Sequence, residues 1–143
     1  MIGISKKLML SIVAVCDIAD NFGDRPVRST RICERQGIPA RYLEPVLQEL
    51  VRDGILIGVR GPQGGYRLGR EPAAISLASI AHVVDITSTA ADFDDDHIAS
   101  RLWTETVQPL SDELTAKWNA QLESISIEDL CIYGGRLKQT RAA

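Results

Sequence analysis

The feature that most constrains this chain is a glycine-rich loop set between two short apolar segments. Residues 60–65 read Arg-Gly-Pro-Gln-Gly-Gly, with the apolar run 55–59 before them and Tyr66-Arg67-Leu68 after them. Glycine allows positive φ and close backbone approach, so this pattern predicts two strands joined by a tight loop. Arg60 and Arg67 make the hairpin basic.

The residues before this hairpin predict two helices joined by a tight turn. Either hydroxyl of Ser29-Thr30 is a candidate cap for a short helix that ends at Gly37. Pro39 is expected in the first turn of a second helix that reaches Arg52. Its apolar residues recur at i, i+3, i+4, i+7 and i+8, which is typical of an amphipathic helix; they are Leu43, Val46, Leu47, Leu50 and Val51. The pattern is that of a helix-turn-helix followed by a wing.

The remaining segments complete a mainly α chain with a small β-wing. A first helix is expected over 5–21, capped by Ser5 and stopped by Gly23, and a short one over 77–84, capped by Ser76. A long helix is expected from 98 to about 124 with a kink or break at Pro109. A last short helix begins at 126–130, and the chain from Gly134 onward is expected to fray. We predict a winged helix-turn-helix domain over 1–85, an acidic linker over 86–97, and a dimerisation helix with a C-terminal tail over 98–143.

Charge is divided unevenly along the chain. The whole sequence carries −3, but residues 1–70 carry +4 and residues 71–143 carry −7. A basic N-terminal half suits contact with phosphates, although a solvated surface gives the same numbers. No apolar run is long enough to cross a bilayer, and no signal peptide is expected. The three scattered cysteines predict a reducing, cytoplasmic location.

The hairpin and the second helix together resemble the Rrf-two family of winged-helix transcriptional regulators. The resemblance lies in Tyr42-Leu43-Glu44-Pro45-Val46-Leu47, in Gly54-Ile55-Leu56, and in the run from Val59 to Leu68. It covers residues 1–85 well and the C-terminal part more loosely. The resemblance implies a homodimeric DNA-binding regulator that reads a palindromic operator, interpreted here as a repressor. The dimer interface is expected on the long helix, at Leu102, Trp103, Leu110, Leu114 and Trp118.

The predicted DNA-binding residues fall into three groups. The second helix of the motif offers Pro39, Ala40, Arg41, Tyr42 and Glu44; the resemblance places a base-reading glutamate at Glu44, where a carboxylate accepts from cytosine. The wing offers Arg60, Gly64, Gly65 and Arg67. Phosphate contacts at helix N-termini are expected from Lys6, Arg28, Ser29 and Thr30. Glu44 as a solvated charge is the alternative, and Arg25, Arg35 and Arg52 are interpreted as surface charge.

The signal that such a regulator would sense is less clearly indicated. The resemblance implies an iron–sulfur cluster on three linker cysteines, but residues 86–100 contain no cysteine, so a cluster of that type is not expected and no cofactor is predicted. Asp94, Asp96 and His97 are weak candidates for metal ligands, and a solvated acidic loop is the alternative interpretation of this segment. Cys33 is a candidate redox switch, with apolar packing as the alternative, and Cys16 and Cys131 are assigned to apolar packing. An unknown small-molecule or protein effector is the third possibility.

Two other classes of function compete with DNA binding. A winged-helix protein-interaction module that has lost sequence-specific DNA binding is the alternative, and the basic wing argues against it. An enzyme is not expected, because the chain has only two histidines and lacks a nucleophile elbow, a phosphate-binding loop and a dinucleotide fingerprint.

Overall fold

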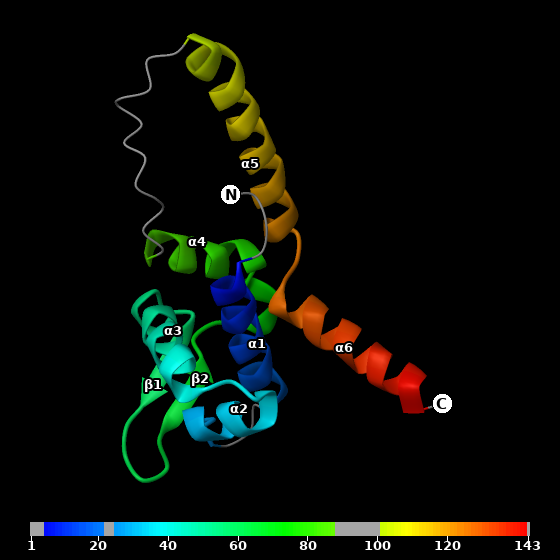
Figure 1. Ribbon diagram of the computed structural model, residues 1–143. Coiled ribbons are helices and arrows are strands. Elements are labelled where there is room, and N and C mark those ends of the chain that lie inside the picture. The colour runs from blue at the N-terminus through cyan, green and yellow to red at the C-terminus, as the bar shows by residue number, and fades with distance from the viewer. Residues whose placement is uncertain (1–4, 22–24, 88–100, 143) are drawn as a thin grey trace.

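The computed structural model describes residues 5–21, 25–87 and 101–142. The elements, in chain order, are α1 (Lys6–Asp20), α2 (Ser29–Gln36), α3 (Ala40–Arg52), β1 (Leu56–Val59), β2 (Gly65–Leu68), the 3₁₀ turn η1 (Pro72–Ala74), α4 (Leu77–Thr87), the π-helical segment η3 (Trp103–Val107), α5 (Gln108–Glu123) and α6 (Ile127–Ala142). Helices α1 to α4 and the hairpin form one head, from which α5 extends on one side and α6 on another (Figure 1). The fold is a winged helix-turn-helix with a long C-terminal helical part, as the sequence predicts.

The ends of α1 and α4 are fixed by serine caps. The Ser5 hydroxyl accepts a hydrogen bond from the Leu8 amide at 3.1 Å, and the Ser76 hydroxyl accepts one from the Ser79 amide at 3.1 Å. Each cap satisfies an amide that the first helical turn leaves unpaired. Both predicted caps are confirmed, and α1 ends at Asp20; the predicted stop at Gly23 lies outside the described residues.

The turn of the helix-turn-helix is confirmed at Gly37, while the predicted cap of α2 is wrong. Gly37 ends α2 with φ of 66°, a left-handed conformation that suits glycine. Arg28, not Ser29 or Thr30, is the N-cap residue, and its side chain makes no capping hydrogen bond. The reason is that the connector is held one residue earlier, where Val27 pairs with Tyr66. Pro39 likewise precedes α3 as its N-cap instead of lying in the first turn.

The wing is an antiparallel hairpin. Leu56 lies opposite Leu68 and Val59 lies opposite Gly65, so the loop spans residues 60–64. Both predicted strands are confirmed to within one residue.

The core joins both ends of the chain. Buried apolar side chains of α1, α3, β1 and α4 pack together with Leu122 of α5 and Ile127 of α6. Main-chain hydrogen bonds support this junction, from the Leu77 amide to the Ile125 carbonyl at 2.9 Å and from the Ile127 amide to the Ile75 carbonyl at 2.8 Å. The end of α5 and the start of α6 are therefore fixed to the head.

The start of α5 departs from regular α-helical geometry. Pro109 stands in the first turn of α5, immediately after the π-helical segment η3. Proline has no amide with which to continue the helical hydrogen bonds from η3 into α5, so the predicted irregularity is confirmed as a π-helical turn rather than a break.

Helix α6 is longer than predicted. The expected fraying from Gly134 is wrong, because the helix continues to Ala142. Its start is well fixed: Ser126 and Asp129 exchange reciprocal side-chain-to-amide hydrogen bonds of 3.1 and 2.9 Å. Once a helix is nucleated, each further residue adds a hydrogen bond, which offsets the roughly 1 kcal/mol cost of a glycine. Among the described residues, no helix has the length and apolar character needed to span a bilayer.

Candidate nucleic-acid interface

Helix α3 presents a polar face to solvent. Leu43, Leu47 and Leu50 are fully buried, which turns Arg41, Glu44 and Gln48 outward. These three residues follow helical spacing and line one shallow groove with Ala40 and Pro45. The Arg41 guanidinium lies over the Tyr42 ring at 4.7 Å, a cation–π contact that holds both side chains near the start of the helix.

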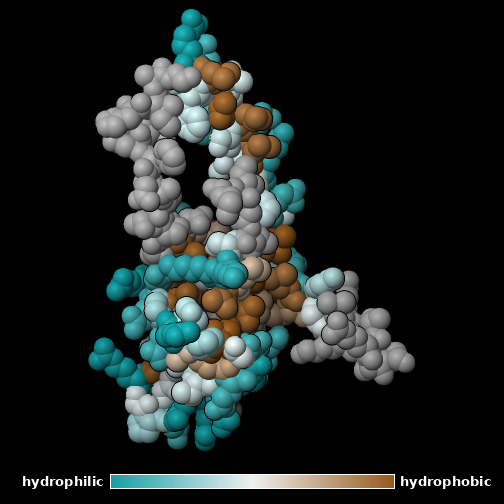
Figure 2. Space-filling model, viewed as in Figure 1, coloured by the Kyte–Doolittle hydropathy of each residue, from teal (hydrophilic) through white to brown (hydrophobic). Residues whose placement is uncertain are grey.

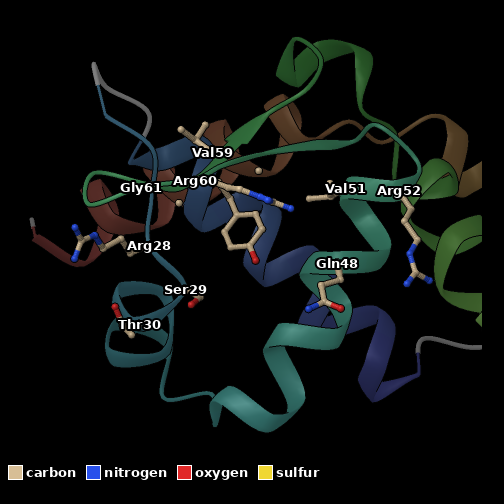
Figure 3. Close-up of a pocket in the computed structure, with 13 residues that line it drawn as sticks. Arg28, Ser29, Thr30, Gln48, Val51, Arg52, Val59, Arg60 and Gly61 are labelled. Carbon is tan, nitrogen blue, oxygen red and sulfur yellow. The ribbon is translucent and has the colours of Figure 1, made fainter.

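A larger cleft separates this helix from the wing. It has a volume of about 830 Å³ and is lined by residues of the connector, α2, α3 and the hairpin: Arg28, Ser29, Thr30, Gln48, Val51, Arg52, Gly58, Val59, Arg60, Gly61, Gly64, Gly65 and Tyr66. Figure 3 shows Arg60 reaching from the wing toward α3, and Gln48 on α3. Among these lining residues the charged side chains are all arginines, so the cleft suits an anion.

The connector before α2 is bonded to the wing. The Val27 amide donates to the Tyr66 carbonyl at 2.9 Å, and the Tyr66 amide donates back at 2.8 Å. The Arg28 guanidinium donates to the Pro62 carbonyl in the wing loop. Gly65 permits this approach, because a Cβ at that position would stand 2.5 Å from the Val27 carbonyl oxygen. These contacts therefore fix the distance between the start of α2 and the wing.

Replacing Gly65 with alanine should loosen this connection. We expect Gly65→Ala to lower the free energy of unfolding by about 1–2 kcal/mol, since the added carbon collides with backbone and φ of 155° is strained for other residues. Urea unfolding followed by circular dichroism measures the change. Gly58→Ala is the matched control, because a Cβ there meets nothing within 4 Å. Equal stability of the two variants would contradict the proposed role of Gly65.

Helix α2 is anchored to α1 by an ion pair with a buried carboxylate. The Asp17 carboxylate of α1 is fully buried and accepts from Arg35 Nε at 3.0 Å, from an Arg35 terminal nitrogen at 2.6 Å and from Gln36 Nε2 at 2.8 Å. Burial alone raises the pKa of the Asp17 carboxyl, but the hydrogen bonds from Arg35 and Gln36 and the Arg35 charge hold that pKa below its usual value. Interpreting Arg35 as mere surface charge was therefore wrong.

The structure brings together most of the residues that the sequence predicts for DNA binding. Six line the cleft, namely Arg28, Ser29, Thr30, Arg60, Gly64 and Gly65. Ala40, Arg41 and Glu44 line the groove on α3, with Pro39 and Tyr42 exposed at its N-terminal end.

Lys6 and Arg67 lie apart from this group. Lys6 is exposed in the first turn of α1 and does not line the cleft. Its neighbour Lys7 forms an ion pair with Glu49 of α3. Arg67 is half-buried on β2 and is not part of the cleft, whereas its neighbour Tyr66 is. Adjacent strand residues point to opposite faces, which accounts for the difference.

Sequence reasoning missed two polar residues of the cleft. Gln48 has no role predicted from the sequence, and Arg52 is predicted only as surface charge; both line the cleft. The sequence contains a signal for both residues. Gln48 lies four residues after Glu44 and Arg52 four after Gln48, a spacing that places all three on one face of the helix. Gln48 also belongs to the groove on α3, so it joins the two surfaces.

The predicted apolar seam is exposed along α5 and the segment before it. Leu102, Leu110 and Leu114 are 66%, 54% and 42% exposed, and hydrophobic side chains follow this helix in Figure 2. Trp103 is half-buried, and Trp118 packs partly against the core. Such a row of large exposed apolar residues is characteristic of a surface that another molecule covers.

Of the candidate sensor residues, Cys33 lies in the part of the chain that the structure describes, and it does not line the cleft. Cys33 is half-buried against the core from α2. Asp94, Asp96 and His97 lie outside the described residues. Within the described part of the chain, no group of three or more His, Cys, Asp or Glu side chains is arranged to hold a metal ion.

These features define a winged helix-turn-helix protein with a basic cleft between its second motif helix and its wing. The model of the Rrf2 family, described as "Iron-dependent Transcriptional regulator", matches residues 4–132. The chain belongs to the Rrf2 family.

Individual relatives agree with this assignment. The chain is 38% identical over 82 residues to the HTH-type transcriptional regulator IscR of Yersinia enterocolitica and 39% identical to that of Vibrio cholerae. These matches cover 57% of this chain, and the chain spans about half the length of these relatives, 50% and 47%. The solved structure of T. potens IscR has a TM-score of 0.72 at 30% identity, covering 92% of this chain and 88% of that one. The solved structure of CymR, described as the global cysteine regulator of B. subtilis, has a TM-score of 0.68 at 25% identity. The match covers 93% of this chain and 98% of that one.

The residues present do not fit the iron–sulfur cluster that the family resemblance implies. Such a cluster needs thiolate ligands, and residues 86–100 contain none. Of the three cysteines in the chain, Cys33 lies in α2, Cys16 in α1 and Cys131 in α6.

Proposed function

We propose that this protein is a cytoplasmic, homodimeric transcriptional regulator that binds double-stranded DNA through α3 and the wing. The observation that carries the proposal is the arginine-lined cleft between these two elements, continuous through Gln48 with the polar face of α3. Such a helix fits the major groove, and a wing beside it reaches the neighbouring part of the duplex. The sugar-phosphate backbone between them would then lie in the cleft.

Phosphate binding follows from the groups that line the cleft. Arg28, Arg52 and Arg60 supply charge, and the N-cap residue makes no side-chain capping hydrogen bond at the start of α2, where Ser29 and Thr30 lie. Free amides at a helix N-terminus favour an anion, and the helix dipole adds to this preference. These contacts would fix the register of the protein on DNA without reading sequence.

Sequence would be read by the exposed residues of α3, with Glu44 as the central one. We expect Glu44→Ala to change the preferred base at one position of each half-site and to lower affinity for the original operator about tenfold, since a carboxylate accepts from cytosine N4. Selection from a random-sequence duplex pool measures both. Glu71→Ala, an exposed glutamate outside the cleft and the groove, is the control. An unchanged consensus for Glu44→Ala would exclude direct readout by this residue.

Dimerisation would use the exposed seam of α5. We expect Leu110→Glu combined with Leu114→Glu to weaken the dimer about 100-fold, because two carboxylates would have to be buried. Light scattering across a dilution series measures the dissociation. Ser111→Glu with Thr115→Glu carries the same charge at the same spacing on exposed positions rotated around the helix, and should remain dimeric. A wild-type monomer, or equal dissociation of both variants, would contradict this part of the proposal.

A symmetric dimer would read a palindromic operator, and its presence there would obstruct transcription, so we assign it a repressor role. Random-duplex selection with the wild-type chain tests the function as a whole. Enrichment of an inverted repeat supports it. Recovery of no preferred sequence would overturn it.

A further inference from the structure

Gln48 lies where the two polar surfaces of α3 meet. Glu44 lines the groove on α3 but not the cleft, and Arg52 lines the cleft but not the groove. Gln48 stands between them at intervals of four residues and lines both surfaces. Along this face of the helix, a carboxylate that suits a base edge therefore gives way to a guanidinium that suits a phosphate, with a neutral amide at the boundary.

The amide group of Gln48 is exposed to solvent. Figure 3 shows the side chain on the part of α3 that borders the cleft. In the described part of the chain, no hydrogen bond or ion pair engages this amide. The next residue, Glu49, is in contrast paired with Lys7 of α1. Gln48 can therefore offer a donor and an acceptor together to a molecule that binds here.

We propose that Gln48 is a second base-reading residue, whose amide donates to N7 and accepts from the N6 amino group of an adenine in the major groove. This inference rests on the proposed DNA binding and names part of the sequence that would be selected. Adenine presents an acceptor and a donor side by side in the major groove, which matches both ends of a glutamine amide. A phosphate presents acceptors alone and would use only the N–H groups, and three arginines already serve the phosphates in the cleft.

The spacing of Glu44 and Gln48 predicts where this adenine lies. Four residues correspond to about 6 Å along a helix axis. Successive base pairs of duplex DNA are about 3.4 Å apart. The adenine should therefore lie one or two base pairs from the pair that Glu44 reads, in the same half-site.

Selection from a random-sequence duplex pool tests the assignment with three chains: the wild type, Gln48→Ala and Gln48→Glu, the variants checked for folding by circular dichroism. Gln48→Ala should lose the adenine preference at one position of each half-site and bind the wild-type operator about tenfold more weakly. Gln48→Glu should prefer cytosine at that position, because a carboxylate only accepts. Preferences at the other positions should remain. Gln121→Ala, at an exposed glutamine of α5 outside both surfaces, is the matched control and should select the wild-type sequence.

A modified base tests the contact from the side of the DNA. Replacing that adenine with 7-deazaadenine removes the N7 acceptor and leaves the Watson–Crick pair intact. We expect this change to weaken binding of the wild type about fivefold, as the loss of one hydrogen bond does, and to leave the affinity of Gln48→Ala unchanged. Fluorescence anisotropy measures both affinities.

Two results would overturn this inference alone. The first is a consensus that Gln48→Ala leaves unchanged. The second is an equal loss of affinity for every duplex with a smaller salt slope, because that behaviour defines a phosphate contact. If the wild-type chain selected no sequence at all, the proposed function would fail and this inference would fail with it, so the two failures are distinguishable.

Discussion

Arg35→Ala should lower the free energy of unfolding by about 2–3 kcal/mol, although Arg35 itself is partly exposed. The reason is its partner: the Asp17 side chain is 0% exposed, and without Arg35 its carboxylate keeps, among the described residues, the hydrogen bond from Gln36. Breaking a buried ion pair typically costs about 3–5 kcal/mol, and the 37% exposure of Arg35 places this pair at or below the low end of that range. Urea unfolding at pH 7 measures the loss.

Arg31→Ala provides the matched control from the same helix. Arg31 pairs with Glu34 on the surface, where the two side chains are 69% and 67% exposed, and an exposed pair of this kind contributes less than about 0.5 kcal/mol. If both variants lost the same stability, the buried carboxylate would not be the anchor of α2.

The same pair predicts a dependence of stability on pH. Because the pKa of Asp17 is lower in the folded chain than in the unfolded chain, its contribution is fully present above the unfolded value, near pH 4, and is lost as the pH falls through the folded value. As the pH is lowered through this range, the free energy of unfolding of Arg35→Ala should therefore fall less than that of the wild type.

Replacing two of the three cleft arginines, Arg52 and Arg60, should have the largest effect on DNA binding. We expect Arg52→Ala combined with Arg60→Ala to weaken binding to every duplex sequence about 100-fold near 0.1 M salt. The slope of log K against log salt should fall by about 1.8, which corresponds to two lost phosphate contacts. Fluorescence anisotropy across a salt series measures both quantities.

The double variant Arg101→Ala and Lys117→Ala removes the same charge from the region of α5. Both residues are exposed, lie far along the chain from the cleft and pair with Glu105 and Glu113. It should bind DNA as the wild type does. If it lost as much affinity as the cleft variant, net charge rather than the cleft would account for binding.

The sequence predicts this fold well where the signals are local. The Ser5 and Ser76 caps, the turn at Gly37 and the hairpin around residues 60–65 each depend on a few neighbouring residues. Their conformational preferences come from neighbouring residues, and the structure confirms all of them.

The errors arise where distant segments meet. Arg35 has the sequence pattern of a surface charge, but α1 places the buried Asp17 carboxylate beside it in the folded chain. The cap of α2 moved to Arg28 because Val27 pairs with the wing. No local pattern contains these contacts, since each joins residues that only the folded chain brings together.

The most direct test of the central claim is the affinity of the wild-type chain for double-stranded DNA as salt increases. The cleft and α3 predict tight binding at low salt that falls linearly on a log–log plot, with a slope of about −0.9 for each phosphate contacted. A selected operator should bind at least about 1,000-fold more tightly than random duplex. An affinity that does not change with salt, or the absence of duplex binding at low salt, would contradict the account.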